Sequence, residues 1–135
     1  MSSFKTFEEI IAWQKARLLC SLIYKTTYKE NFRKDYGLSD QIRRSSVSVM
    51  ANIAEGYERR GDKELIRFLN IARGSLSEVK SHLYVALDLN YITEKEISEL
   101  FLLIDETGKL INGLSNYLTK SKKLEFKNNN ELNKN

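Results

Sequence analysis

Residues 65–86 read LIRFLNIARGSLSEVKSHLYVA, and they carry the clearest repeat in this sequence. Apolar side chains recur there at alternating spacings of four and three residues, which places them along one side of an α-helix. The repeat consists of Leu65, Leu69, Ala72, Leu76, Val79, Leu83 and Ala86. A stripe of this kind is typical of a helix that packs in a bundle. The spacing therefore predicts a bundle helix over residues 63–89.

Capping motifs indicate where two further helices begin. In a capping box, the side chains of a threonine and of a glutamate three residues later satisfy each other's free backbone donors. Thr6 with Glu9 predicts the start of the first helix, and Thr93 with Glu96 predicts the start of the last. The apolar content of the first helix is broad, which indicates packing on more than one neighbour. Together with the helix over 63–89, the predicted helices span residues 7–29, 36–59 and 94–120.

The helix over residues 36–59 has two apolar stripes. The first predicts a core face and comprises Leu38, Ile42, Val49 and Ile53, with Ser45 among them. The second lies well round the helix, where one antiparallel bundle does not bury it, so we expect it to contact another copy of the chain. The expected interface comprises Val47, Met50, Ala54 and Tyr57, together with Gly74 of the next helix. After the helix over 36–59, Gly61 and Asp62 predict a stop followed by a new N-cap.

Length and composition favour one folded unit. The chain has 135 residues and no proline, so long helices are uninterrupted. Short turns between four long helices favour antiparallel neighbours. We therefore expect residues 1–120 to form an all-α, up-down-up-down antiparallel four-helix bundle. Residues 121–135 are rich in lysine and asparagine, which predicts a disordered tail.

The residue inventory argues against catalysis. The chain has one histidine and one cysteine, too few for a familiar metal or nucleophilic site. Glu78 and His82 share a helix face, but the second Glu-x-x-His copy that di-iron bundles use is absent, so His82 is expected to pack with its polar atoms satisfied. We expect no enzyme activity, no cofactor and no metal. Without a signal peptide or a long apolar run, a cytoplasmic location is also expected.

Basic residues gather in the first half of the chain. Lysine and arginine outnumber aspartate and glutamate over residues 1–60, whereas the reverse holds over 93–119. Arginine suits phosphate contact, because its guanidinium binds phosphate in a bidentate manner. The alternative is that these residues form ion pairs, within helices or between subunits, with nearby acids. The candidate nucleic-acid-binding residues are Arg43, Arg44, Arg59, Arg60, Lys63, Arg67 and Arg73.

Two polar features remain open to interpretation. Asn52 and Glu55 either belong to a solvated helix face or form a partly buried network with Arg44 that fixes the helix register. Gly74 interrupts the next helix, where small polar neighbours leave room for another backbone, from a second subunit or a nucleic acid. Tyr36 and Tyr57 suit stacking on bases, although helical tyrosines more often pack at core edges.

Four segments of the sequence resemble one known family. They are WQKA (residues 13–16), GLSDQIRRSSVSVMANIAEG (37–56), FLNIARGSLSE (68–78) and LNYI (89–92). In these segments the chain resembles the four-helix-bundle proteins encoded by intervening sequences inside bacterial 23S ribosomal RNA genes. The likeness covers about residues 4–119.

The resemblance implies properties that the residues alone do not establish. It implies an up-down bundle that assembles into a ring-like homopentamer. It also implies kinship with the accessory variability determinant proteins of diversity-generating retroelements, which bind nucleic acid and a reverse transcriptase. We therefore expect an oligomeric, non-enzymatic protein that binds RNA or DNA and has a reverse transcriptase as a further candidate partner. The competing hypothesis is a structural or protein-interaction scaffold, in which the arginines form ion pairs between subunits.

Overall fold

The protein is described by a computed structural model that covers residues 4–133, with side chains for residues 4–121 and 126–132. It contains a short 3₁₀ turn, η1 (Phe7–Glu9), and five α-helices. The α-helices are α1 (Ile11–Thr27), α2 (Glu30–Lys34), α3 (Tyr36–Glu58), α4 (Asp62–Asp88) and α5 (Glu94–Asn133). No strand occurs in the part of the chain that is described. The all-helical fold expected from the sequence is confirmed.

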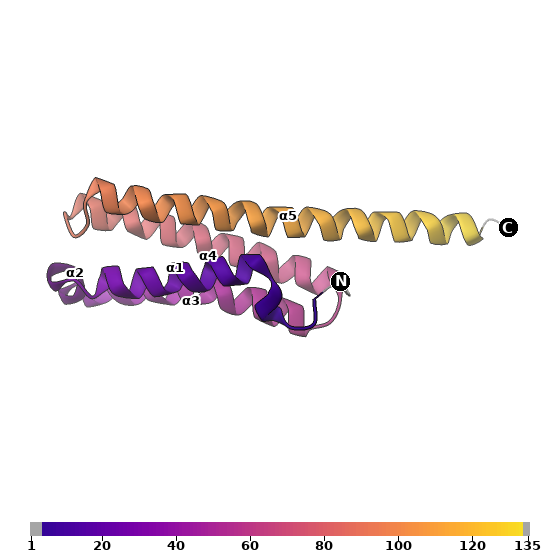
Figure 1. The fold of residues 1–135 in the computed structure, drawn as a ribbon, viewed down its shortest axis with the longest axis horizontal. Coiled ribbons are helices and arrows are strands. Elements are labelled where there is room, and N and C mark those ends of the chain that lie inside the picture. The colour runs from indigo at the N-terminus through magenta and orange to yellow at the C-terminus, as the bar shows by residue number, and fades with distance from the viewer. Residues whose placement is uncertain (1–3, 134–135) are drawn as a thin grey trace.

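The four long helices run up, down, up and down along a common axis (Figure 1). Helix α1 packs against α3 and α5, and α4 packs against the same two helices. Short connections join consecutive helices, so each runs antiparallel to the next. The short helix α2 connects α1 to α3 and lies at one end of the bundle (Figure 1).

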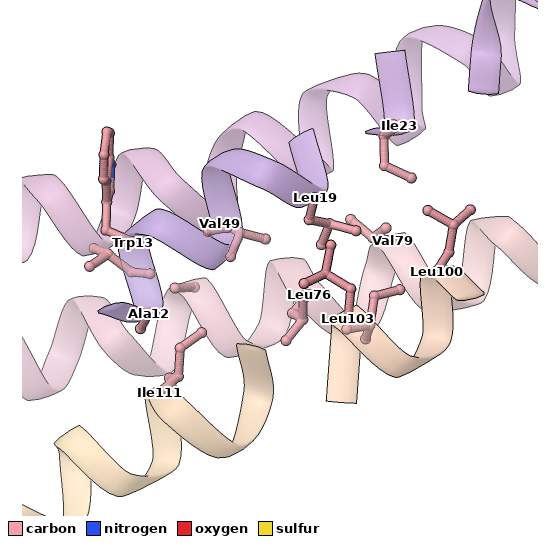
Figure 2. Close-up of a cluster of buried hydrophobic side chains, with 14 of the residues drawn as sticks. Ala12, Trp13, Leu19, Ile23, Val49, Leu76, Val79, Leu100, Leu103 and Ile111 are labelled. Carbon is pink, nitrogen blue, oxygen red and sulfur yellow. The ribbon is translucent and has the colours of Figure 1, made fainter. Parts of the chain in front are cut away.

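The core lies along the stripes that the sequence predicted. All seven residues of the α4 stripe are buried, and so are Ile42, Ser45, Val49 and Ile53 of α3. Helix α5 contributes Ile97, Leu100, Ile104, Ile111 and Leu118. Figure 2 shows side chains of α1, α3, α4 and α5 meeting in this core, among them Leu19, Val49, Val79 and Leu103. Burial of these apolar side chains is the main favourable term for the fold.

The first long helix begins later than expected. The Glu9 carboxylate accepts a hydrogen bond from the backbone N–H of Lys5 (2.6 Å) and not from that of Thr6, which forms no side-chain cap. The predicted capping box at Thr6 is therefore wrong, and α1 starts only at Ile11. A packing contact explains the turn, because the Phe7 ring lies edge-on to Trp13 with ring centroids 5.1 Å apart.

The turn between α3 and α4 also differs from expectation. Arg60, with φ of 56°, takes the left-handed conformation that ends α3, whereas Gly61 is extended with φ of 178°. Gly61 is the N-cap of α4 and Asp62 is already its first residue, so the predicted roles shift by one position. The second capping box is confirmed, since Thr93 Oγ1 accepts from the N–H of Glu96, and Glu96 Oε1 accepts from the N–H of Thr93, both at 3.1 Å.

Helix α5 continues to Asn133, although the sequence indicated a disordered tail over residues 121–135. No proline interrupts the segment, and its lysine, leucine and glutamate residues favour helix. The described side chains from Phe126 to Leu132 are exposed. Residues 134–135 lie outside the described part of the chain. Among the described residues, no helix combines the length and apolar character that a bilayer crossing needs.

Candidate nucleic-acid interface

The seven basic residues proposed from the sequence do not form one patch. Arg43 and Arg44 lie in the first half of α3, whereas Arg59 and Arg60 follow its other end, about 24 Å away at 1.5 Å per residue. Arg73 lies in the middle of α4. Only Arg59, Arg60, Lys63 and Arg67 lie together, at the turn between α3 and α4.

Ion pairs engage two arginines of that turn. Arg59 Nη2 lies 2.9 Å from Glu55 Oε1, and Arg67 Nε lies 2.8 Å from Glu64 Oε2. The hydrogen bond from Arg67 lowers the pKa of the Glu64 carboxyl. Both guanidinium groups also lie over the Phe68 ring, at 5.4 and 4.4 Å from its centroid. The arginine-rich turn is therefore largely charge-balanced, although Arg60 and Lys63 remain exposed.

Arg73 connects two helices. Its Nη1 donates to Asn112 Oδ1 of α5 (2.9 Å), and its Nη2 donates to Asn70 Oδ1 of α4 (2.8 Å). Phosphate binding by Arg73 would compete with both hydrogen bonds. The side chain thus has a structural role in joining α4 to α5.

The polar network of α3 differs in membership from the expected one. Asn52 Nδ2 donates to the Ser48 carbonyl (2.8 Å) and to Ser48 Oγ (2.9 Å). Ser48 Oγ in turn lies 2.8 Å from Ser75 Oγ of α4. Arg44 and Glu55, the other expected members, take no part, because each forms an ion pair within α3. The network thus joins α3 to α4 through two serines, a link that can fix the register of the helices.

The residues expected at an oligomer interface divide into two groups. Val47 is 40% exposed, and an added Cβ on Gly74 would meet no atom within 4 Å. The other three are partly buried against the core of their own chain: Met50, Ala54 and Tyr57. The Tyr57 hydroxyl also donates to the Phe4 carbonyl at 2.7 Å. The bundle itself therefore covers most of the second stripe of α3.

Helix α2 is fixed by contacts that the sequence did not reveal. Phe32 is fully buried, and its ring packs on Tyr91 with centroids 5.2 Å apart. Ser39 Oγ donates to the Phe32 carbonyl at 2.8 Å. Asp35 caps α3 by accepting from the Leu38 N–H (3.1 Å), and it also accepts from the Tyr91 hydroxyl (3.1 Å). That last hydrogen bond raises the pKa of Tyr91.

Tyrosines and arginines lie close together at the end of the bundle that holds α2, where Arg33 is exposed and Arg43 is half-buried. The Arg33 guanidinium lies 5.6 Å from the ring centroid of Tyr28, and that of Arg43 lies 5.1 Å from Tyr24. Arg43 Nε also donates to Thr27 Oγ1 at 2.8 Å, which orients its side chain. Cationic and aromatic groups therefore alternate over this end of the bundle.

Tyr28, Arg33 and Arg43 line an open groove of about 910 Å³, which we call the α2 groove. Its cationic and aromatic lining consists of Tyr28, Arg33, Lys34, Tyr36 and Arg43. Asp40 also lines the groove, but its carboxylate is paired with Arg44 at 2.8 Å. Of the lining residues, the sequence indicated phosphate contact for Arg43 and base stacking for Tyr36. The spacing of tyrosines and basic residues over 24–36 is the signal in the sequence, but residues 30–35 lie between the helices predicted over 7–29 and 36–59.

The acidic, histidine and cysteine side chains of the described part of the chain are dispersed with respect to metal binding. That part holds no group of three or more histidine, cysteine, aspartate or glutamate side chains placed to bind a metal ion. Glu78 Oε2 accepts a hydrogen bond from Ser45 Oγ of α3 at 3.1 Å. His82 differs from expectation, because its Nδ1 is buried without a hydrogen-bond partner. The α2 groove is therefore the better candidate for a functional site.

These features define a protein class: an all-helical bundle with a cationic, tyrosine-lined groove at one end. The chain belongs to the family of 23S rRNA-intervening sequence proteins, whose family model matches residues 8–113. The resemblance drawn from the sequence is thereby confirmed.

One solved structure shows the same fold. It is the crystal structure of a protein with unknown function from the S23 ribosomal protein family of Bacteroides thetaiotaomicron VPI-5482. That protein is 27% identical to this chain, with a TM-score of 0.70, and the match covers 77% of this chain and 97% of that one. Comparison with curated protein sequences gives no match.

Proposed function

We propose that this protein binds RNA through the α2 groove and acts as a non-enzymatic accessory protein. The single observation that carries the proposal is the grouping of Arg33, Lys34 and Arg43 with exposed tyrosines around one groove. Membership of the 23S rRNA-intervening sequence family supports RNA as the polyanion. In this proposal the protein contributes binding, and the groove residues contact phosphates and bases.

The charge around α2 supports phosphate contact. Basic side chains outnumber acidic ones in this region. The basic ones are Lys25, Lys29, Arg33, Lys34, Arg43 and Arg44, and the acidic ones are Glu30, Asp35, Asp40 and Glu96, the last of which is paired with Lys29. Lys34 lies 3.8 Å from Glu30, and both side chains are largely exposed, so the pair is weak and a phosphate can replace the carboxylate. Binding that neutralises phosphates releases counterions, so the affinity should fall steeply with salt.

The test is a titration of a labelled 23S ribosomal RNA fragment at about 50 and 200 mM salt. We expect binding at low salt, a fall in affinity of tenfold or more at the higher salt, and loss of binding in R33E/R43E. The matched control is R59E/R67E, which reverses the same number of charges at the α3–α4 turn. The absence of binding by the wild-type chain at both salt concentrations would refute the proposal.

A second candidate function is a homo-oligomeric scaffold. It is favoured by exposed apolar side chains on the outer side of α1, where Ile11 is 55% exposed and Leu18 is 47% exposed. In this alternative Arg59 and Arg67 would exchange their partners within the chain, Glu55 and Glu64, for acidic groups of a neighbouring subunit. A ring-like homopentamer is the assembly that the family resemblance implies. R59E/R67E would then dissociate the oligomer while leaving RNA binding at the α2 groove unaffected. A reverse transcriptase stays a candidate partner of either form.

A further inference from the structure

The tyrosines of this chain differ in how far their rings are exposed to solvent. The rings of Tyr57 and Tyr91 are partly buried, and their hydroxyls donate to the Phe4 carbonyl and the Asp35 carboxylate. In contrast, Tyr28 is 68% exposed and Tyr36 is 82% exposed. A tyrosine at the edge of a core normally buries its ring and leaves the hydroxyl in contact with water. Tyr28 and Tyr36 leave ring surface accessible, which is what stacking on a ligand requires.

Both exposed tyrosines belong to the α2 groove. Tyr28 caps the end of α1, and Tyr36 is the first residue of α3, so α2 separates them along the chain. The buried Phe32 fixes α2, and the Asp35 cap fixes the start of α3, so both tyrosines have rigid supports. At about 910 Å³ the groove is as large as typical small-molecule sites, so unpaired bases fit into it.

We propose that the α2 groove selects single-stranded RNA, whose bases stack on Tyr28 and Tyr36 while Arg33, Lys34 and Arg43 contact the backbone. This inference rests on the proposed RNA-binding function and names its substrate class. Aromatic side chains next to basic ones are the usual means by which proteins hold single strands. In a duplex the bases are already stacked on each other, so their faces are inaccessible to the two rings.

A second copy of this chain is a poorer occupant of the groove. A symmetric contact would bring like charges together, because the groove is basic. Several acidic side chains of α5 form ion pairs with lysines of their own chain. Glu106 lies 3.2 Å from Lys15, Asp105 lies 3.6 Å from Lys80, and Glu96 is paired with Lys29. RNA supplies both negative charge and stacking faces in one ligand, so the lining favours RNA.

The experiment measures binding of the full chain to fluorescein-labelled 12-nucleotide oligouridine and oligoadenosine, and to a 12-base-pair RNA duplex, by fluorescence anisotropy at about 50 mM salt. The variants are Tyr28→Ala, Tyr36→Ala and the corresponding phenylalanine substitutions, which keep the aromatic ring. The matched control is Tyr117→Ala on α5, because Tyr117 is 61% exposed and lies outside the groove. Circular dichroism checks the fold, and light scattering checks the mass of each variant.

We expect single strands to bind at least tenfold more tightly than the duplex. Each alanine variant should lose affinity for single strands by about tenfold, a value typical of one base stack. The phenylalanine variants and Tyr117→Ala should bind like the wild type. Every tyrosine variant should bind the duplex with the affinity of the wild type, because phosphate contacts alone hold a duplex.

Four results would overturn the inference. Equal affinity for single strands and duplex, or alanine variants that bind like the wild type, would reject stacking while the charge-reversal test above still supports RNA binding. A change of mass in Tyr28→Ala or Tyr36→Ala would show that the groove contacts another copy. Failure of the wild type to bind any of the three RNAs would reject the proposed function itself.

Discussion

Gly56 and Gly74 are both helical glycines, but their surroundings are opposite. An added Cβ on Gly56 would lie 2.6 Å from the Phe68 Cβ and 3.4 Å from the Leu65 Cα, so the residue lets α3 and α4 approach each other. An added Cβ on Gly74 would meet nothing within 4 Å. Glycine in a helix costs about 1 kcal/mol relative to alanine. The close contact explains that cost at Gly56, whereas no contact among the described residues explains it at Gly74.

This contrast predicts opposite effects of the same substitution. Gly56→Ala should lower the free energy of unfolding by about 1–3 kcal/mol through overpacking, and Gly74→Ala should raise it by about 0.5–1 kcal/mol. Urea denaturation at fixed protein concentration measures both. A Gly56→Ala variant as stable as the wild type would contradict the packing argument. A loss of stability in Gly74→Ala would indicate that another copy lies against Gly74.

Single-residue environments were the hardest to predict from the sequence. Tyr36 and Tyr57 carried the same expectation, yet the structure exposes Tyr36 and leaves Tyr57 partly buried. Tyr57 differs because its hydroxyl donates a hydrogen bond to the carbonyl of Phe4, which is far away along the chain. Tertiary contacts of this kind have no local signature in a sequence. The same holds for Ser48, whose partner Ser75 lies on another helix.

At the scale of the elements, the periodicity of apolar residues predicted which helix faces are buried in the core. The stripe of α4 and the core stripe of α3 followed directly from the spacing of apolar residues, because a bundle has to bury them. Helix ends and short helices were harder to predict from the sequence. Helix α2 depends on burial of Phe32 against Tyr91, a contact between segments distant in sequence. The α2 groove was missed for the same reason, since its position depends on α2.

Two threonines with the same local motif provide a prediction about helix caps. Thr93→Ala removes a formed capping box and should lower the free energy of unfolding by about 1 kcal/mol. Thr6→Ala removes no side-chain cap, so its effect should stay within about 0.5 kcal/mol. Thermal denaturation of both variants makes the comparison. Equal losses would mean that the Thr6 side chain stabilises the N-terminal turn by another route.

At the scale of the whole molecule, the proposed assembly gives a mass prediction. Light scattering should give a multiple of the 15.7 kDa chain mass, five-fold for the homopentamer. A variant that ends at Lys120 should form the same assembly, because the family match ends at residue 113 and the described side chains from Phe126 to Leu132 are exposed. A wild-type mass of one chain would refute the assembly. Dissociation of the shortened variant alone would place subunit contacts on the end of α5.

The length of α5 also determines how the protein can be handled. With 40 residues it extends about 60 Å, against about 40 Å for the 27 residues of α4, so its C-terminal part projects past the bundle. That projecting end and α2 lie at opposite ends of the molecule (Figure 1). A chain tethered to a sensor surface through its C-terminus would therefore stand on a helical stalk and present the α2 groove to the solution.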